Sequence, residues 1–535
     1  MQKIIIKNAF LIFFIVASSQ SHAQLFQNLL IGNAKALALG QAVTADPPGI
    51  DAVHFNPAGL TRLKGRQMEI KVLAADFSLV GEFELNNPEI IQRYNELDLV
   101  DPMEGARTEV DSLGVYLPVV GFTEVPFPIA PLGGVSYNKI GSKWTFANSV
   151  YAPMAFGLSR GDDNPGVIFG RKLAITRLTF FAPSFGYEVT DTFSVGMTVA
   201  FSFTGMAANL VYRASGGVIR ELAELLDQVC DRTDREGFVL EVPFLNVCGG
   251  AISPFGGLFD FDVDLKKNLS YTYNIGLLWD VTEWLTLGMV YQSESVDTLK
   301  GKMDIQIYPE LLGLLNGLAE NEPLKTILLD AAQHPTDGHI EETGSMRLVT
   351  PQHLSFGMSL MVLPKLKFNV DVKWTETSQW AELDFQTDNN VGLFGLFTVL
   401  QVKGASPNAL TVPRGYVDTV NWGFGLEYQY NAKTALRFGY EPRKTGIPDD
   451  RRDFLVPVAD MDVIAVGFSR KLSKTSSFDL TIATTKSDMF IPTGSSRNGN
   501  DHTEINNFIY HPTAGLDTRS SLSIFLIETS YRKHF

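Results

Sequence analysis

The 535-residue sequence predicts an all-β fold, a transmembrane antiparallel β-barrel of about fourteen strands with an N-terminal plug, or hatch, in its lumen. Three observations lead to this prediction. Apolar and polar residues alternate in many long segments, no run of about 20 apolar residues follows Gln24, and the last alternating segment ends on Phe535. Without a membrane helix, a chain of this kind can cross a membrane only as a closed barrel.

Alternation with a period of two residues is the strongest signal. From Leu366 to Trp374 every even position is apolar and every odd position is polar, and the same division recurs in 193–203, 271–281 and 420–430. These segments carry Trp and Tyr near the ends of the apolar stripe, as expected where one face meets lipid and the other a polar lumen. A soluble sandwich also alternates, so the number and length of the segments decide.

Short connections pair these segments into hairpins, and longer polar stretches lie between the hairpins. The short connections are expected at Lys139–Ser142, Val189–Thr192, Val281–Trp284, Leu363–Leu366, Tyr430–Thr434 and Leu472–Thr475. With a first strand near Gln67–Phe83 and a last strand near Leu522–Phe535, the count is about fourteen, and bacterial barrels have an even number. Short turns then face the periplasm, and the long loops face outside.

The N-terminus predicts export. Two lysines precede the apolar run Phe10–Ala17, and Ser21-His22-Ala23 forms a small-x-small cleavage site, so we expect residues 1–23 to be a signal peptide. The aromatic strand that ends on Phe535 is typical of barrels inserted by the barrel-assembly machinery. We therefore expect a bacterial outer-membrane location, with this machinery and outer-membrane lipids as partners.

Charge and cysteine content limit the remaining partners. The net charge of -15 and the absence of a clustered Lys/Arg face argue against a nucleic-acid partner. An even number of cysteines in an exported chain favours a disulfide between Cys230 and Cys248, worth roughly 3 kcal/mol by loop-entropy arguments. Two unpaired buried thiols are the alternative.

Motifs for catalysis and metal binding lack the context that they need. Gly157-Leu158-Ser159-Arg160-Gly161 matches a hydrolase nucleophile elbow, but a loop follows where that elbow requires a helix. The three acidic residues of 260–264 lack the glycine and the closing glutamate of a calcium loop. His334 and His339 have no third ligand for zinc. The sequence therefore predicts no enzyme, no metal site and no cofactor.

Residues 24–66 do not alternate and are rich in Ala, Gly and Leu before Asn56-Pro57-Ala58-Gly59. A disordered leader would be more polar, so a compact hatch is expected here, followed by the barrel at 67–535. In this segment, at Trp374–Trp380 and at Leu436–Pro442, the sequence resembles the FadL/TodX family of outer-membrane long-chain fatty acid and hydrocarbon transporters. The further residues that carry the resemblance are Ala42, Ala45, Asp46 and Ile447–Arg452.

The resemblance implies passive uptake of hydrophobic small molecules, which outer loops capture and the barrel wall releases laterally. Two long loops, 214–264 and 307–344, are predicted to be partly helical and are the third and fourth outer loops, where the family collects its ligand. Their apolar stripes could equally pack on each other or on the rim. The candidate ligand-binding residues in these loops are Ile219, Leu222, Leu226, Leu311, Leu312, Leu315 and Leu318.

Two further residues are candidates for functional roles. Arg213, at the outer end of the fifth strand, is a candidate for meeting a substrate carboxylate, and Pro153 is a candidate for a kink that opens the wall, although proline is equally common at strand ends. We expect a monomer. A lipid-modifying enzyme of the outer membrane and an adhesin or receptor are the alternative functions.

Overall fold

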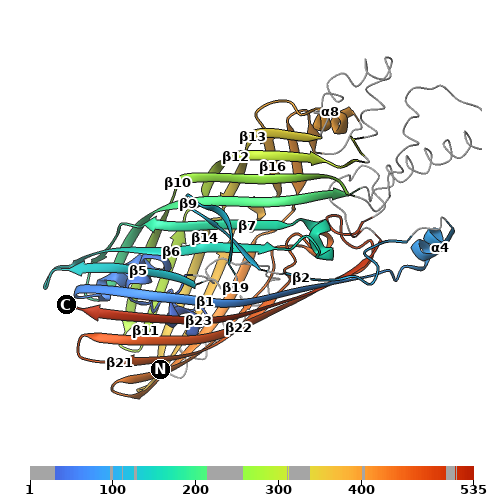
Figure 1. Ribbon diagram of the computed structural model, residues 1–535. Coiled ribbons are helices and arrows are strands. Elements are labelled where there is room, and N and C mark those ends of the chain that lie inside the picture. Colours follow the sequence, from blue (N-terminus) through green and yellow to red (C-terminus); the bar gives the residue numbers. More distant parts are fainter. Residues whose placement is uncertain are drawn as a thin grey trace, which may run out of the picture.

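The computed structural model describes residues 31–96, 100–110, 112–125, 129–213, 257–309, 311–312, 338–399, 404–501, 513 and 515–535. They form the predicted closed antiparallel barrel of 14 strands (Figure 1). β1 (Gly65–Glu84) closes it by pairing with β23 (Asp517–His534) from Gln67 to Glu84. Among these residues, no helix is long and apolar enough to cross a membrane.

Nine barrel strands are single elements, and five are interrupted once. The single strands are β1, β5 (Ile129–Asn138), β6 (Trp144–Ser159), β9 (Phe193–Arg213), β10 (Gly257–Thr282), β20 (Thr434–Arg443), β21 (Met461–Lys471), β22 (Ser476–Ile491) and β23. The interrupted strands are β7 (Lys172–Phe181) with β8 (Ser184–Glu188), β11 (Leu285–Gln292) with β12 (Ser295–Ile307), β13 (His339–Thr350) with β14 (His353–Leu363), β15 (Leu366–Thr375) with β16 (Glu382–Thr387), and β18 (Ala409–Pro413) with β19 (Thr419–Asn431).

The remaining elements lie in the lumen, in one strand interruption and in the outer loops. Inside the barrel are α2 (Ala34–Ala38), η1 (Gly49–Asp51), α3 (Ala52–Phe55) and η2 (Pro57–Arg62). η5 (Thr377–Gln379) lies in the interruption between β15 and β16, and the outer loops contribute α4 (Pro88–Glu96), β2 (Arg107–Glu109), β3 (Leu113–Leu117), β4 (Gly121–Val125), η3 (Pro165–Phe169), α8 (Gly392–Val399), β17 (Ala405–Ser406) and η6 (Asp449–Arg451).

Alternation along the strands separates lipid from lumen as predicted. On β15, Asp371 and Lys373 point inward and are buried, whereas Trp422 and Tyr428 of the neighbouring β19 are 41% and 44% exposed on the outside. Each predicted short turn joins two paired strands, for example β10 to β11 and β21 to β22. Because β1 begins and β23 ends beside each other, the hatch enters from the end of the barrel that carries the short turns.

The strands next to the third and fourth outer loops extend further than the sequence suggested. Gly257–Asp264 already belongs to β10, and His339–Gly344 already belongs to β13. The alternation in β10 continues here, with Phe259 and Phe261 fully buried on one face. The other face carries three aspartates that pair with Arg171, Lys172 and Tyr116.

Candidate functional site

The N-terminal segment fills the lower lumen because the strands around it carry inward-facing glycines. A Cβ atom on Gly439 of β20 would lie 2.1 Å from the backbone nitrogen of Gly40. A Cβ atom on Gly196 of β9 would lie 2.2 Å from the carbonyl carbon of Pro57. Real Cβ contacts are never this short, so a larger residue at either position would displace the segment.

Asn56-Pro57-Ala58-Gly59 fixes this segment to the wall. The Asn56 side chain donates to the carbonyl oxygens of Thr44 (2.8 Å) and of Leu277 on β10 (3.0 Å). Its Oδ1 accepts the N–H of Ala58 at 3.1 Å and caps η2, in which Pro57 occupies the first turn. Asn56 therefore caps η2, bonds to Thr44 elsewhere in the N-terminal segment and attaches that segment to β10.

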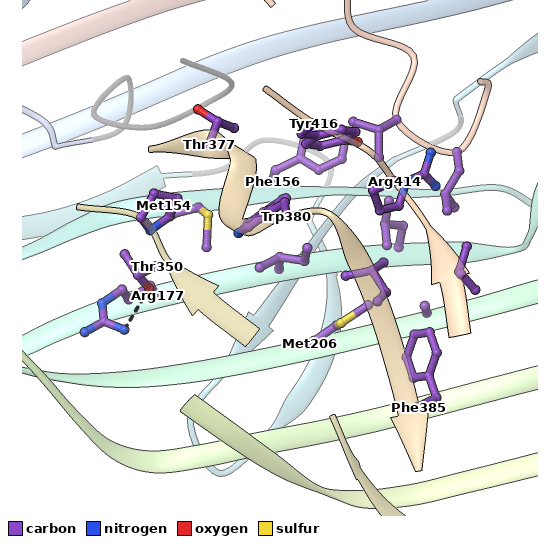
Figure 2. Close-up of a pocket in the computed structure, with 18 of the residues that line it drawn as sticks. Met154, Phe156, Arg177, Met206, Thr350, Thr377, Trp380, Phe385, Arg414 and Tyr416 are labelled. Carbon is purple, nitrogen blue, oxygen red and sulfur yellow. Dashed lines mark hydrogen bonds between the residues drawn. The ribbon is translucent and has the colours of Figure 1, made fainter. Parts of the chain in front are cut away.

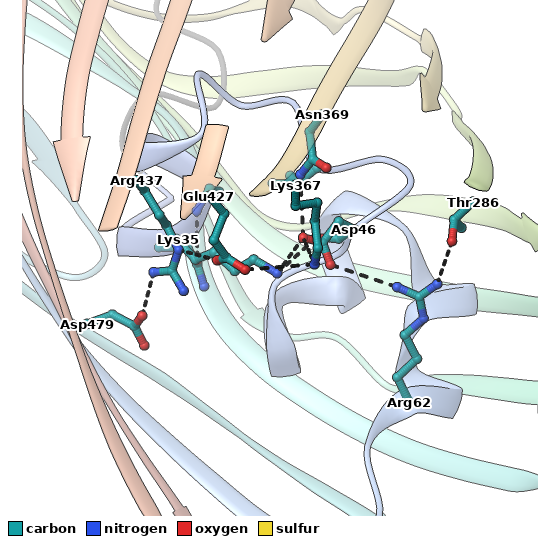
Figure 3. A network of polar contacts seen from close by, with 12 residues as sticks. Lys35, Asp46, Arg62, Thr286, Lys367, Asn369, Glu427, Arg437 and Asp479 are labelled. Atoms are coloured by element: carbon teal, nitrogen blue, oxygen red, sulfur yellow. Dashed lines mark hydrogen bonds and ion pairs between the residues drawn. The ribbon is translucent and has the colours of Figure 1, made fainter. Parts of the chain in front are cut away.

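Charged residues attach the segment to β15 and, through Lys367, to Glu427 of β19 (Figure 3). Asp46 lies 2.9 Å from Lys35 Nζ and 3.1 Å from Lys367 Nζ, and Lys367 also faces Glu427. Burial by itself raises the pKa of Asp46, but the attraction of Lys35 and Lys367 is stronger and holds it far below its usual range. Asp46 is therefore ionised and paired at every physiological pH.

Asp371 of β15 makes a second attachment. Its Oδ2 accepts the backbone N–H groups of Val43 (2.9 Å) and Thr44 (2.8 Å). The carboxylate thus satisfies two buried donors of a segment that has no regular secondary structure. The contacts of Asn56, Asp46 and Asp371 all join the hatch to barrel strands. Strands on several sides of the lumen therefore hold the hatch in place.

A pocket lies in the lumen next to β6, β7 and β9 (Figure 2). The chain between β15 and β16 lines its other side, where Trp380 Nε1 donates to the carbonyl oxygen of Val349 at 2.6 Å and its ring stacks on Tyr416. The apolar residues that line it include Met154, Phe156, Ile175, Met206, Leu210 and Phe385. Its free volume is about 90 Å³, so a ligand larger than a few water molecules must displace side chains. Unbranched methionine side chains suit that rearrangement.

Aromatic rings connect this pocket to the outer end of the barrel. Phe385, which lines the pocket, packs edge-to-face on Phe261 with ring centroids 5.4 Å apart, and Phe261 contacts Phe394 of α8 at 6.1 Å. Leu311 belongs to the same buried cluster, and Leu312 packs partly buried against it. An apolar path therefore leads from an outer-loop helix to the pocket.

Two buried arginines, Arg177 and Arg414, line the pocket, and Arg414 forms an ion pair with Asp453. Arg177 of β7 is 1% exposed, and its Nη1 donates to Asp297 (3.0 Å), Thr350 (3.1 Å) and Thr204 (3.3 Å). Its Nη2 has no hydrogen-bond partner among the described residues. Lys267 Nζ lies 2.9 Å from the other oxygen of Asp297, so two cations share one carboxylate and one positive charge is left over.

The wall beside the pocket is irregular at Pro153. Tyr151 pairs with Thr179, whereas Met154 pairs with Arg177, so β6 has one residue more than β7 over this stretch and forms a bulge. Pro153 lies in the bulge and lines the pocket.

Most of the outer-loop residues singled out in the sequence lie outside the described part of the chain. These are Ile219, Leu222, Leu226, Leu315, Leu318, Cys230 and Cys248. Arg213 is the last residue of β9 and stands opposite Gly257 of β10. Leu311 is buried, as expected if the apolar stripe of its loop packs against other residues instead of facing the medium. Ser159 ends β6 and donates to Glu124, without the strand-to-helix turn of a nucleophile elbow.

Sequence reasoning missed Arg177 and α8. The cluster Leu393-Phe394-Gly395-Leu396-Phe397 in an outer loop was a visible signal for α8, since loops at the surface are usually polar. Arg177 gave no such signal, because its partner Asp297 lies 120 residues further along the chain.

Comparison with known proteins decides the family. A family model described as outer membrane protein transport protein (OMPP1/FadL/TodX) matches residues 13–535. The chain belongs to this family. Its members are outer-membrane transport proteins rather than enzymes, which places this chain in the outer membrane and confirms the expected family, fold and location.

Solved structures share the fold at low identity. A FadL homologue from Pseudomonas aeruginosa is 16% identical with a TM-score of 0.64, and the match covers 96% of this chain and 100% of that one. The toluene transporter TodX of Pseudomonas putida is 15% identical (TM-score 0.57, 96% and 100% covered), and the toluene transporter TbuX of Ralstonia pickettii is 16% identical (0.55, 95% and 99%). A putative outer membrane protein of Neisseria meningitidis is 28% identical over 183 residues, which is 34% of each chain.

Proposed function

We propose that this FadL/TodX-family barrel is a passive channel for hydrophobic small molecules that carry an anionic head, such as long-chain fatty acids. The observation that carries the proposal is the buried Arg177, whose Nη2 is unpaired among the described residues and which lines a largely apolar pocket. A neutral ligand would leave this charge without compensation, which is costly in a low-dielectric site. A carboxylate would supply both the missing acceptor and the missing charge.

Capture would begin at the outer loops. The apolar residues predicted at 219–226 and 311–318 would collect the ligand, and Arg213 would make the first contact with its head. The described aromatic path from Phe394 through Phe261 to Phe385 supports the inward step, because burial of an alkyl chain among rings is favourable at about 25 cal/mol per Å². No energy source is encoded, so the gradient and the partition into lipid drive uptake.

Release would occur through the wall at Pro153. The pairing of β6 with β8 ends at Ala147 and Ser184, and the pairing with β7 starts only at Tyr151 and Thr179. On the side that faces β7 and β8, β6 therefore lacks ladder pairs at 148–150, next to the bulge, whereas its pairing with β5 continues there. Widening this gap costs fewer hydrogen bonds than opening any fully paired seam.

The hatch would act as the gate. Asp51 of the hatch accepts a hydrogen bond from Ser149 Oγ at 2.9 Å, and Ser149 lies on β6 within the gap. A shift of the hatch would therefore act directly on the strand that borders the opening. The barrel-assembly machinery is the partner that we expect for membrane insertion. We expect the oligomeric state to be a monomer.

A binding measurement with matched ligands tests the substrate class. Arg177→Met should weaken the binding of palmitic acid by at least about tenfold, the effect of losing one charge-assisted hydrogen bond of roughly 1.5–3 kcal/mol. Binding of methyl palmitate, which has the same chain without the charge, should change little. Heat-modifiable migration on gels verifies folding of the variant.

A neutral hydrocarbon is the second candidate substrate. The apolar lining of the pocket and the fold shared with the toluene transporters TodX and TbuX support it. Under this alternative, native protein would bind methyl palmitate or toluene at least as tightly as palmitic acid, and Arg177→Met would affect the acid and the ester equally.

A further inference from the structure

A groove of about 570 Å³ runs along the lipid-facing side of β1, β5 and β6, outside the lumen. Its apolar walls are the outward side chains of Val135, Tyr137, Phe146 and Phe535, which are 54%, 47%, 55% and 73% exposed. Strand register places them side by side, since Tyr137 pairs with Arg66 on β1 and with Phe146 on β6. The groove is therefore a feature of the membrane-facing surface and belongs to neither the pocket nor the hatch.

Arg66 lies at the lower end of the groove, where β1 begins. Its guanidinium carbon is 5.8 Å from the centre of the Tyr137 ring, and its backbone oxygen accepts the N–H of Phe535 at 3.0 Å. The Arg66 side chain is exposed and forms no ion pair among the described residues. A cation next to aromatic rings at a strand end occupies the level of the lipid headgroups.

The neighbouring part of the rim is basic, although the chain as a whole carries a net charge of -15. The members of this basic arc are Arg66, Lys139, Lys143, Lys471, Lys474 and Lys533, on the turns and ends of the adjacent strands β21, β22, β23, β1, β5 and β6. The terminal carboxylate of Phe535 lies among these cations, and Glu188 at the end of the neighbouring β8 pairs with Lys64. The basic arc ends at β6, because the next turn along the rim, between β8 and β9, carries Asp191, and the end of β10 with its following turn carries Asp280 and Glu283.

We propose that this groove is a binding site for an anionic phospholipid of the periplasmic leaflet, with its phosphate on Arg66 and one acyl chain along Val135 and Phe146. Three features favour this occupant. The walls are apolar where hydrocarbon surrounds them, the cation is at headgroup level, and the arc attracts anionic lipid rather than zwitterionic lipid. The volume lies within the roughly 300–1,000 Å³ typical of small-ligand sites.

The upper end of the groove is closed by a polar side chain. Asn148 faces outward on β6, and its Oδ1 accepts the N–H of Ala182 at 2.7 Å across the stretch that lacks ladder pairs. A lipid seated in the groove would therefore extend from the rim to this point. The site stands on its own geometry and does not depend on what the channel transports.

Native mass spectrometry of the detergent-solubilised barrel tests the proposal. Phosphatidylglycerol and phosphatidylcholine with identical acyl chains are added in turn, and the bound fraction is measured. Native protein should retain phosphatidylglycerol preferentially. Arg66→Gln should reduce that preference about fivefold, which corresponds to the roughly 1 kcal/mol of one basic residue near an anionic headgroup.

Two further variants separate a specific site from general attraction. Lys474→Gln removes a charge of the same arc on the β21–β22 turn and should leave most of the preference intact. Val135→Trp fills the groove without changing charge and should reduce retention of both lipids. Equal binding of the two lipids by native protein, an equal effect of Arg66→Gln and Lys474→Gln, or displacement of the lipid by palmitate alone would overturn the proposal.

Because Arg66 and Val135 are exposed, both variants should fold, and heat-modifiable migration verifies this. Lipid retention is read out without any transport assay, so failure here leaves the proposed transport intact. Conversely, loss of palmitate binding in Arg177→Met has no bearing on the groove.

Discussion

Asp51 of the hatch and Lys71 of β1 form an ion pair of 2.7 Å in which neither side chain is more than 1% exposed. Asn33 Nδ2 and Ser149 Oγ also donate to Asp51, at 2.7 and 2.9 Å. One carboxylate therefore ties together the hatch, β1 and β6. Removing one partner of such a pair costs about 3–5 kcal/mol, because the other charge stays buried without compensation.

Lys71→Met should therefore loosen the hatch without unfolding the barrel. We expect more frequent channel openings in planar lipid bilayers than for native protein. The double variant Lys71→Met/Asp51→Leu leaves neither member of this ion pair behind and should return the opening frequency toward the native value. Equal opening in the single and double variants would contradict this electrostatic account.

Gly196→Val should displace the hatch by steric overlap, because the added Cβ would lie 2.2 Å from Pro57. Increased ion conductance and faster proteolysis near residues 56–60 are expected. Gly395→Ala on α8 is the matched control, since a Cβ atom there meets nothing within 4 Å. A native conductance in Gly196→Val would show that the hatch tolerates the added side chain.

The hatch should be anchored less firmly at mildly acidic pH. Burial, reinforced by His353, Lys71 and Lys373, lowers the pKa of His54 well below its ordinary value of about 6.5. A released hatch binds a proton on His54 below about pH 6.5 and a docked hatch does not, so this contribution to docking is complete above that pH and declines below it.

Bilayer conductance at pH 7.5 and pH 5.5 measures this effect, with more openings expected at the lower value. Asp46 should not contribute over this range, because its depressed pKa keeps it ionised. His54→Gln removes the titrating group and should flatten the pH dependence. A pH response that persists unchanged in His54→Gln would assign it to another group.

Ala208→Trp should block the pocket. Ala208 is fully buried on β9 and lines the pocket, so an indole there would fill the limited free volume. Uptake of palmitate by a strain that depends on this channel should fall at least about tenfold if the pocket lies on the route. Phe490→Trp on the lipid-facing side, 39% exposed, adds the same indole elsewhere and should leave uptake unchanged.

Much of the barrel could be predicted because period-two alternation is a local property. The segments at 366–374 and 420–430 became β15 and β19, and the turn at Leu472–Thr475 joined β21 to β22. The sequence was less informative about how far the strands extend beyond the membrane. At Gly257–Asp264 the polar face carries only aspartates, which resemble a loop until their partners are known.

The site could be predicted only in part, because its properties depend on distant partners. Pro153 was recognised from its chemistry, but the extra residue of the bulge follows from the register between β6 and β7. Arg177 stands at an inward position like Ile175, and nothing local reveals that Asp297 is shared with Lys267. That one carboxylate serves two cations that are far apart in the sequence becomes visible only in the folded barrel.

The hatch contacts have a consequence for assembly. Ser530 of β23 accepts a hydrogen bond from Ala34, Thr481 of β22 donates to the Ala34 carbonyl, and Thr198 of β9 donates to that of Val53. Strands from distant parts of the chain thus meet the same short segment. We expect the seam between β1 and β23 to close last, around a hatch already in place, so that the hatch serves as an internal template for the barrel it later obstructs.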